Sequence, residues 1–501
     1  MARTGQADTE AVRGGGAGDR PRPGDLLELH VTDLAHGGAG VARRDGYVVF
    51  VDGGLPGDTV RAKVTKARRD YGNARAVDVL EPSPDRVPPR CDHDGEQCPG
   101  SPWQTLRYER QLEHKQRQVG DALARLGRLS EYSLEPIIAA EQIWRYRNKM
   151  EYSFGEKNRP SAGEPADGLE SGRPSAGEPA DGLESGRQRL VLGFHARGHW
   201  ERVLDARDCM LASERSNAVR NLVRDWCERQ GLAAFDRRSG TGFLRNLVVR
   251  EGRRSGDLQV RLVTGPGDFA ATELADAVRA DFPEASLLWT TTDTAAEVSY
   301  GGETTVVAGQ DRLVEQLEGL TFRISPEAFF QTNTEMAERL YRLASDYAGL
   351  EGRERVFDLF CGIGTLSLVL ALHASEVWAV DVSEQSIADA IENARANEVS
   401  NVHFFAGDAR TAIRPLAEMA PRPDVAVVDP PRAGLSKKVV RRLLETRPQR
   451  IVYVSCNPTT LAPNARQIVD AGFRLVKVRP VDMFPHTPHI ECVALFVRED
   501  G

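Results

Sequence analysis

Residues 321–501 alternate between short apolar runs and amphipathic stretches of helical period. The apolar runs have the length of buried strands, and most are followed by a stretch long enough for a crossover helix. Strands that alternate with helices pair in parallel, because the chain returns along one face of the sheet before the next strand begins. This region therefore predicts an α/β fold with a doubly wound, mostly parallel sheet. The expected strands are 355–360, 376–381, 402–406, 425–429, 451–455, 475–481 and 493–497.

Three other segments precede this region. Residues 1–23 are rich in Gly, Arg and Pro without an apolar period, and we expect them to be disordered. Residues 24–82 carry short alternating strands separated by glycine turns, which predicts a small, closed, OB-like β-barrel. Residues 83–320 mix strands with helices and predict an α+β central domain.

Within the central region one 14-residue unit occurs twice, at 159–172 and at 173–186. Each copy is rich in Pro, Gly, Ser and Glu and contains a single leucine, so two copies cannot bury a core. We interpret 159–187 as a disordered insertion between two strands, without a part in catalysis.

The composition is that of a globular protein, with 41% hydrophobic and 28% charged residues in a chain of 501. No run approaches the ~18 apolar residues needed to cross a bilayer, and the N-terminus shows no secretory signal. Seven cysteines, an odd number, fit reduced thiols better than a disulfide framework. We expect a cytoplasmic monomer that has no membrane partner.

The net charge of −8 does not exclude a nucleic-acid partner, because a local basic patch sets the field at a binding face. Such a patch surrounds Tyr71 in the predicted barrel. A mixture of basic and aromatic side chains suits phosphates and base faces, although a solvated strand face has the same composition. The basic residues are Arg61, Lys63, Lys66, Arg68, Arg69 and Arg75.

Residues 356–365 have the pattern of a strand, a turn with two glycines and the start of a helix. Such a turn lets the backbone approach a ligand closely. Ser367 stands in place of the third glycine of a pyrophosphate fingerprint, which favours S-adenosylmethionine over a dinucleotide. Asp381 ends the next strand, where an acid can bind ribose hydroxyls, and Asp408 follows the third strand, where it can face an adenine. The alternative is that these are only tight turns.

Cys456 directly follows the apolar run 451–455, so a thiol is expected at the end of a buried strand. Asp429 ends an earlier expected strand, Arg432 follows it, and Glu491 precedes the last strand. Open α/β sheets carry their chemistry at such strand ends, and a thiol near charged side chains is typical of nucleophilic catalysis. The alternative is an inert buried cysteine.

Five segments of the chain stand out in this order: 324–333, 358–364, 429–434, 454–458 and 483–491. Together they resemble, in sequence and in order, motifs of the RNA uracil-5-methyltransferases. The barrel resembles the TRAM domain that many ribosomal members carry, and 146–149 resembles the start of the RNA-facing strand of the central domain. The resemblance implies a Rossmann-like S-adenosylmethionine methyltransferase domain behind a TRAM barrel, acting on RNA. We expect 23S rRNA as the substrate, because bacterial tRNA-specific relatives usually lack the barrel; tRNA is the alternative.

The chemistry of such enzymes explains the residue types. Carbon 5 of uracil is a poor nucleophile, but a thiolate that adds to carbon 6 makes an enolate whose carbon 5 can take a methyl group. The adduct then loses its carbon-5 proton to a base and expels the thiol, so a nucleophile and a separate base are needed. By resemblance Cys456 is the nucleophile and Glu491 the base. A free thiol has a pKa of ~8.5, so Cys456 needs a positive neighbour, for which Arg432 is a candidate. The target base is expected to leave its stack.

The resemblance also implies a set of contacts to S-adenosylmethionine. Thr365 and Asp408 stand where the family often has Asn. The expected contacts are Gln331, Phe360, Thr365, Asp381, Asp408 and Asp429.

The segment around Cys91 and Cys98 resembles the iron–sulfur segment of ribosomal members, with Cys209 as the distant ligand. Ser101 replaces the third family cysteine, whereas a 4Fe-4S cluster is normally held by four thiolates. Two interpretations remain open: a cluster with serine or another fourth ligand, or a loop whose thiols are structural. His93 could suggest zinc, but the spacing matches zinc ribbons poorly.

Two other functions remain open. Methylation of an amino group needs no cysteine, and the Asp-Pro-Pro at 429–431 lacks the stacking aromatic residue that such sites use. A non-catalytic RNA-binding or ribosome assembly factor would keep the barrel but would tolerate loss of Cys456.

Overall fold

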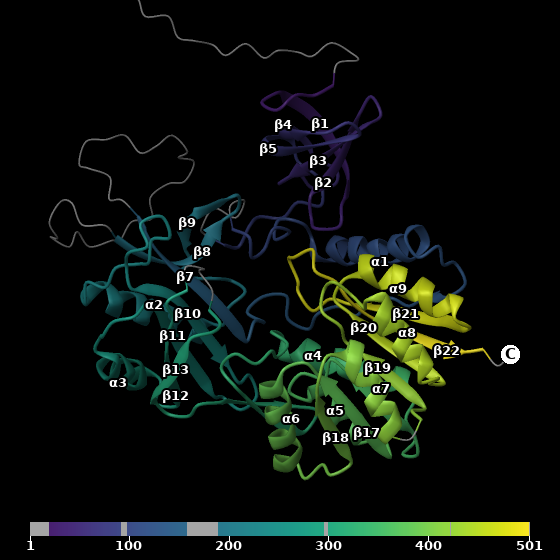
Figure 1. Cartoon of the computed structure of the whole chain (residues 1–501). Coiled ribbons are helices and arrows are strands. Elements are labelled where there is room, and N and C mark those ends of the chain that lie inside the picture. The colour runs from purple at the N-terminus through teal and green to yellow at the C-terminus, as the bar shows by residue number, and fades with distance from the viewer. Residues whose placement is uncertain (1–19, 92–97, 158–188, 295–298, 421, 500–501) are drawn as a thin grey trace, which may run out of the picture.

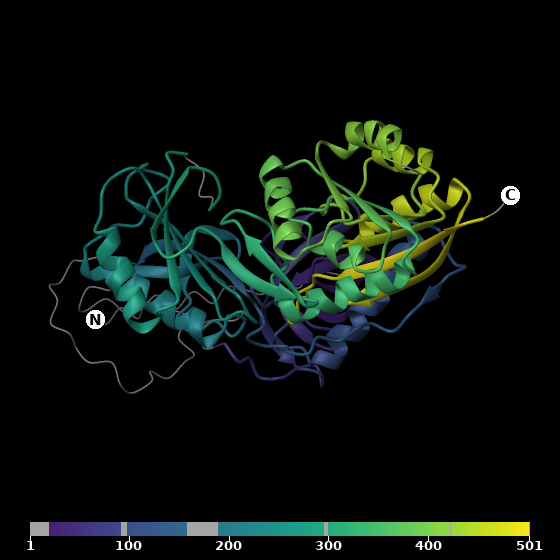
Figure 2. The same cartoon turned by 90° about the horizontal axis from the view of Figure 1, so that it is seen from below.

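The computed structural model describes residues 20–91, 98–157, 189–294, 299–420 and 422–499. Most of the expected disordered tail and the whole expected insertion lie outside these residues. The described chain forms a barrel, a central sheet domain and a C-terminal sheet domain, the last two side by side (Figures 1 and 2). No helix within the described ranges is long and apolar enough to cross a membrane.

The first unit is a closed barrel. Its strands are β1 (Leu26–Leu34), β2 (Gly40–Arg44), β3 (Tyr47–Asp52), β4 (Thr59–Ala67) and β5 (Tyr71–Glu81). They follow the order β1-β2-β3-β5-β4, and alternate side chains such as Leu29, Val49 and Val60 fill the interior. The predicted OB-like barrel is confirmed. Sequence reasoning missed β2, because Gly-Val-Ala-Arg-Arg has too little apolar alternation to indicate a strand.

The central domain is built on a seven-stranded sheet with the helices α2 and α3 on one face. The elements are β7 (Lys149–Lys157), β8 (Arg189–Ala196), β9 (His199–Asp205), α2 (Glu214–Arg229), β10 (Leu244–Glu251), β11 (Leu258–Thr264), α3 (Ala271–Asp281), β12 (Ala285–Thr291) and β13 (Glu303–Ala308). The order is β13-β12-β11-β10-β7-β8-β9, and only β11 and β12 pair in parallel among these strands. Tyr152, Val223 and Val260 share the core between sheet and helices.

A hairpin connects the central domain to the C-terminal domain. It consists of β14 (Leu313–Leu317) and β15 (Leu320–Ile324), and the 325–333 loop then leads to α4 (Thr334–Ala348). Asn333 ends this loop and caps α4, because its side chain accepts a hydrogen bond from the Met336 amide. Gln331 therefore lies immediately before a well-defined helix start.

The C-terminal domain holds an eight-stranded sheet. Its remaining elements are β16 (Arg355–Leu359), α5 (Thr365–Ala371), β17 (Glu376–Asp381), α6 (Glu384–Ala396), β18 (Val402–Ala406), α7 (Ala409–Met419), β19 (Val425–Val428), α8 (Lys437–Glu445), β20 (Arg450–Ser455), α9 (Pro458–Asp470), β21 (Phe473–Val481) and β22 (Glu491–Arg498), together with β6 (Ser133–Leu134). The order is β18-β17-β16-β19-β20-β22-β21-β6, parallel from β18 to β20, with β22 antiparallel to both neighbours. Helices pack on both faces, so the doubly wound, mostly parallel sheet is confirmed.

One helix packs on this sheet although it lies far upstream in the sequence. Helix α1 (Tyr108–Arg125) runs beside α9 and buries Val119 and Leu123 in the core of the C-terminal domain (Figure 1). The short strand β6 follows it and pairs in parallel with β21. Both elements fall within 83–320, which we expected to form the central domain. Residues 108–134 thus belong to the C-terminal domain, although they precede the strands of the central sheet in the sequence.

Candidate active site

The expected nucleophile and base lie at one edge of the C-terminal sheet. Ser455, the last residue of β20, pairs with Cys492 in the antiparallel ladder to β22, which places Cys456 and Glu491 at the same end of two neighbouring strands. Asp429 follows β19, which runs parallel to β20 on its other side. Cys456 is half-buried, whereas Glu491 is only 5% exposed. The sheet thus brings together three residues that are far apart in sequence.

Burial and negative neighbours keep this thiol protonated. Burial, together with the charges of Glu491 and Asp429 and against that of Arg432, raises the pKa of Cys456 to about 11. The pKa of Glu491 is raised well above its ordinary range by burial first and by Asp429 second, with Arg432 acting in the opposite direction. Arg432 is thus the cation whose charge favours the ionised form of both groups.

The nucleophile and Arg432 are held together through the backbone. The side chain of Asn457, the residue after the thiol, donates to the Arg432 carbonyl at 3.2 Å, and the Thr460 hydroxyl donates to the same oxygen at 3.2 Å. Asn457 also caps α9 by accepting from the Thr459 amide. The Ser-Cys-Asn-Pro sequence therefore fixes the start of α9 and the loop that carries Arg432.

The predicted cofactor turn lies at the same edge of the sheet. The Asp381 carboxylate accepts hydrogen bonds from the Gly362 amide at 3.0 Å and from the Ser383 amide at 2.9 Å, which joins the turn after β16 to the end of β17. Phe360 adopts a φ of 71°, which is unusual for a non-glycine residue, and is only partly buried. Gly364 has a φ of 81°, and a Cβ there would lie 3.1 Å from the ring of Phe404. The turn therefore depends on glycine at 364.

A buried carboxylate that sequence reasoning missed lies under this turn. Asp358 is 1% exposed and accepts a hydrogen bond from the Ser367 hydroxyl at 2.5 Å. Burial raises the pKa of Asp358 to about 7, with Asp381 adding to the effect, and burial with Asp358 raises the pKa of Asp429 to about 7. An acid inside the otherwise apolar strand β16 was the available signal. Burial thus raises the pKa of one carboxyl group at the end of each of these two neighbouring strands.

Two other expected cofactor residues already have protein partners. Asp408 caps α7 by accepting from the Arg410 amide at 2.8 Å and also pairs with the Arg410 side chain, which lowers the pKa of Asp408 to about 2. Thr365 lies at the start of α5, with its hydroxyl 3.3 Å from that of the buried Tyr341. Their roles as cofactor contacts stay predictions.

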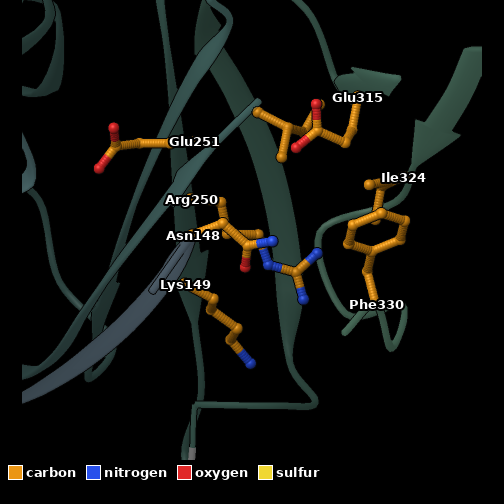
Figure 3. A pocket seen from close by; sticks show the side chains of 8 residues that line it. Asn148, Lys149, Arg250, Glu251, Glu315, Ile324 and Phe330 are labelled. Atoms are coloured by element: carbon orange, nitrogen blue, oxygen red, sulfur yellow. The ribbon is translucent and has the colours of Figure 1, made fainter. Parts of the chain in front are cut away.

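The 325–333 loop, which carries Gln331, is fastened to the central domain. The Asn148 side chain donates to the Gln331 carbonyl at 2.9 Å and to the Thr334 hydroxyl at 2.8 Å. Arg250 donates to the carbonyls of Ser325 at 3.1 Å and Ala328 at 2.7 Å. Figure 3 shows Asn148 and Arg250 on the walls of a small cavity that Phe330 also lines. The sequence placed Asn148 in the 146–149 segment that resembles an RNA-facing strand, whereas the structure buries its side chain against the 325–333 loop. Sequence reasoning missed Arg250, because a buried arginine in a strand has no periodic signature.

The barrel also reaches this edge. The Trp103 indole donates to the Gly38 carbonyl in the β1–β2 turn at 3.2 Å, and a Cβ on Gly38 would lie 3.2 Å from Pro488. Pro488 belongs to the motif that ends at Glu491, so the turn of the barrel lies against the segment that carries the expected base.

The expected iron–sulfur ligands are buried thiols. Burial, with smaller contributions from the nearby Cys209 and Cys91, raises the pKa of Cys98 to about 11, so the three thiols lie in one region. Ser101 is 2% exposed beside them. Within the described ranges, no group of three or more His, Cys, Asp or Glu residues has an arrangement that could hold a metal ion. His93 lies outside the described residues, and the expected cluster stays a prediction.

Comparisons with known proteins bear on this geometry. The family model for tRNA (uracil-5-)-methyltransferase matches residues 298–499, and the TRAM domain model matches residues 21–77. An uncharacterized RNA methyltransferase of Halalkalibacterium halodurans is 36% identical over 474 residues, covering 94% of this chain and 96% of the relative. Another from Chlorobaculum tepidum is 38% identical over 489 residues, covering 96% and 98%. The chain belongs to the RNA uracil-5-methyltransferase family.

A solved member of similar architecture is the Pyrococcus abyssi tRNA (uracil-54, C5)-methyltransferase in complex with S-adenosyl-L-homocysteine. It is 26% identical, with a TM-score of 0.72 over 94% of this chain and 99% of that chain. The chain is an RNA methyltransferase of this family with a TRAM barrel, and the expected family and enzyme class are confirmed.

Proposed function

We propose that this enzyme methylates carbon 5 of a uridine in RNA, with S-adenosylmethionine as methyl donor, through a covalent bond between Cys456 and the uracil ring. The observation that carries the proposal is the edge of the C-terminal sheet, where Cys456, Glu491 and Asp429 meet beside the glycine turn. The turn at 360–365 and the partly exposed Asp381 fit a nucleoside, and the solved relative binds S-adenosyl-L-homocysteine. When bound there, S-adenosylmethionine supplies an electrophilic methyl group.

The residues then have distinct tasks. Cys456 gives its proton to water, with Arg432 stabilising the thiolate, and its sulfur adds to carbon 6 of the ring, which sends the electron pair toward carbon 5 and the carbonyl at carbon 4. Carbon 5 takes the methyl group as the bond between that group and the donor sulfur breaks, and the Glu491 carboxylate then removes the proton from carbon 5. The electron pair of that C–H bond re-forms the ring double bond and expels the Cys456 thiolate. Burial of Glu491 raises its affinity for the proton, which suits a base of this kind.

The proposed substrate is 23S rRNA, and the TRAM barrel beside the Glu491 segment supports it. The second candidate is tRNA, which is favoured by the substrate of the solved relative. Mass spectrometry of 5-methyluridine in both RNAs from a deletion strain distinguishes them: loss from 23S rRNA alone supports the first, and loss from tRNA alone contradicts it. We further propose that the enzyme acts as a cytoplasmic monomer, with S-adenosylmethionine contacts at the six expected residues.

The covalent step is tested with RNA that contains 5-fluorouridine at the modified site. Fluorine cannot leave as a proton does, so the wild-type enzyme is expected to form a protein–RNA adduct that survives denaturing electrophoresis. Cys456→Ala should form none, and Cys227→Ala, which removes a buried thiol in α2, should still form it. Undiminished methylation by Cys456→Ala would refute the mechanism.

A further inference from the structure

The position of the proposed base depends on a loop that precedes it. Glu491 is the first residue of β22, paired with Val481 at the end of β21, and residues 482–490 connect the two strands. No donor among the described residues hydrogen-bonds to the Glu491 carboxylate, whose pKa reflects only burial and nearby charges. The carboxylate is therefore aimed by its own backbone, and so by whatever fixes the 482–490 loop.

A buried ion pair fixes the beginning of that loop. The Lys115 ammonium of α1 donates to the Asp482 carboxylate at 2.6 Å and to the Phe484 carbonyl at 3.0 Å, and the side chains of Lys115 and Asp482 are both 0% exposed. The Tyr108 hydroxyl donates to the other carboxylate oxygen of Asp482 at 2.8 Å. The Phe484 amide also donates to Asp482, at 3.3 Å.

The same helix fixes the middle of the loop. The Gln111 side chain accepts from the His486 amide at 2.8 Å, one turn before Lys115 on α1. The Trp103 amide donates to the His486 carbonyl at 3.0 Å, and the Tyr146 hydroxyl donates to the Pro485 carbonyl at 3.1 Å. His486 has a φ of 65°, an uncommon conformation for a residue with a side chain. These contacts hold the loop in a shape that its own sequence does not favour.

Packing alone does not account for the charged pair. Helix α1 already buries Val119 and Leu123 against the C-terminal core, and an apolar residue at 115 could extend that surface without the cost of desolvating an ammonium and a carboxylate. Lys115 instead contacts both a side chain and a backbone carbonyl of the loop. Such a geometry restricts direction as well as distance, which an apolar contact does not.

We propose that Lys115 and Asp482 are positioning residues for the proton-removal step: together they hold the 482–490 loop so that Glu491 faces carbon 5 of the methylated ring. This rests on the proposed function, because it takes Glu491 as the base. Neither residue touches the substrate. Cys456 directly follows β20, outside the loop, so the pair acts on release of the product and leaves formation of the adduct nearly unchanged.

Two rates measured on the same RNA sequence separate these steps. Adduct formation with 5-fluorouridine RNA reports nucleophilic attack and methyl transfer, and tritium release from RNA containing [5-³H]uridine reports removal of the carbon-5 proton. In Lys115→Met/Asp482→Asn, which removes both charges together, tritium release should fall about tenfold or more, since small misplacements of a reacting group are costly. Adduct formation should stay within about threefold of wild type, and an adduct should accumulate on ordinary RNA.

A milder variant and a control keep the test decisive if the double variant folds poorly. Tyr108→Phe removes the hydrogen bond to Asp482 and the one that the hydroxyl accepts from the Ala140 amide, and it should slow tritium release in the same selective way, to a smaller extent. Lys477, on β21, is partly exposed and forms an ion pair with Glu135. Lys477→Met removes this pair and should change neither rate. Equal loss of both rates in Tyr108→Phe and the double variant, or no loss in either, would overturn the proposal. If the wild type forms no adduct, the proposed function itself fails.

Discussion

Removal of the Asn148 side chain should weaken cofactor binding, although Asn148 belongs to the central domain. The side chain is 5% exposed and donates to the Gln331 carbonyl at 2.9 Å and the Thr334 hydroxyl at 2.8 Å. In Asn148→Ala the Gln331 carbonyl loses this donor, whereas the Thr334 hydroxyl keeps its bond to Glu315 at 2.8 Å. The backbone bond from the Asn148 amide to the Thr332 carbonyl also survives.

These contacts set the magnitude. A lost hydrogen bond costs about 1 kcal/mol net, and a buried carbonyl left unpaired costs about 1–3 kcal/mol. The Gln331 carbonyl loses its donor and the Thr334 hydroxyl keeps its bond to Glu315, so the cost lies in the lower half of that range, at most about 2 kcal/mol. The 325–333 loop can relieve the unpaired Gln331 carbonyl by moving away from the central domain. If Gln331 contacts the cofactor, the loop must return to its original position when the cofactor binds, and that return costs binding free energy. Affinity should then fall by up to about thirtyfold, since 1.4 kcal/mol corresponds to tenfold.

The assay is calorimetric titration of S-adenosylhomocysteine together with thermal melting. Asn246→Ala is the matched control, because Asn246 is an equally buried asparagine on β10 whose amide reaches Tyr152 and Ser153 only at 3.4 Å and does not contact the loop. It should melt lower than wild type but bind the ligand normally. If Asn148→Ala and Asn246→Ala melt alike and both keep wild-type affinity, the central domain does not set the position of Gln331.

Three further outcomes are expected. Because burial raises the pKa of Cys456 to about 11, the thiolate fraction of the free enzyme rises with pH throughout the neutral range, so alkylation of Cys456 by iodoacetamide should increase about tenfold per pH unit between pH 7 and 9; a plateau near pH 8 would contradict the raised pKa. Gly434→Ala should lower the free energy of unfolding by about 2 kcal/mol in urea titrations, because position 434 has a φ of 71° and a Cβ would lie 2.9 Å from the Asn464 side chain; unchanged stability would refute this. Glu491→Gln should transfer the methyl group but stall, seen as adduct accumulation on ordinary RNA by denaturing electrophoresis; rapid turnover would exclude Glu491 as the base.

Local patterns in the amino-acid sequence specify much of this fold. Strands β17 and β18 begin and end where the sequence predicts them, because an apolar run flanked by turn residues leaves a buried strand little freedom. The same patterns place the end of β20 at Ser455, as observed, and the end of β19 one residue too late, at Asp429, which directly follows the strand. The sequence motifs alone indicate the family, the type of reaction and the residues at the strand ends.

The way in which distant segments support that edge depends on the folded chain as a whole. The amphipathic pattern of helix α1 does not indicate which sheet the helix packs against. A lysine on a helix, such as Lys115, would ordinarily be expected to face solvent. Its partner Asp482 is 367 positions away, and Asn148 meets Gln331 across 183 positions. Hydrophobic periodicity is a local property of the chain, whereas a buried polar contact is satisfied by whichever group the folded chain brings within about 3 Å. The residues at the strand ends can therefore be predicted from the sequence, whereas the buried polar contacts that position them cannot.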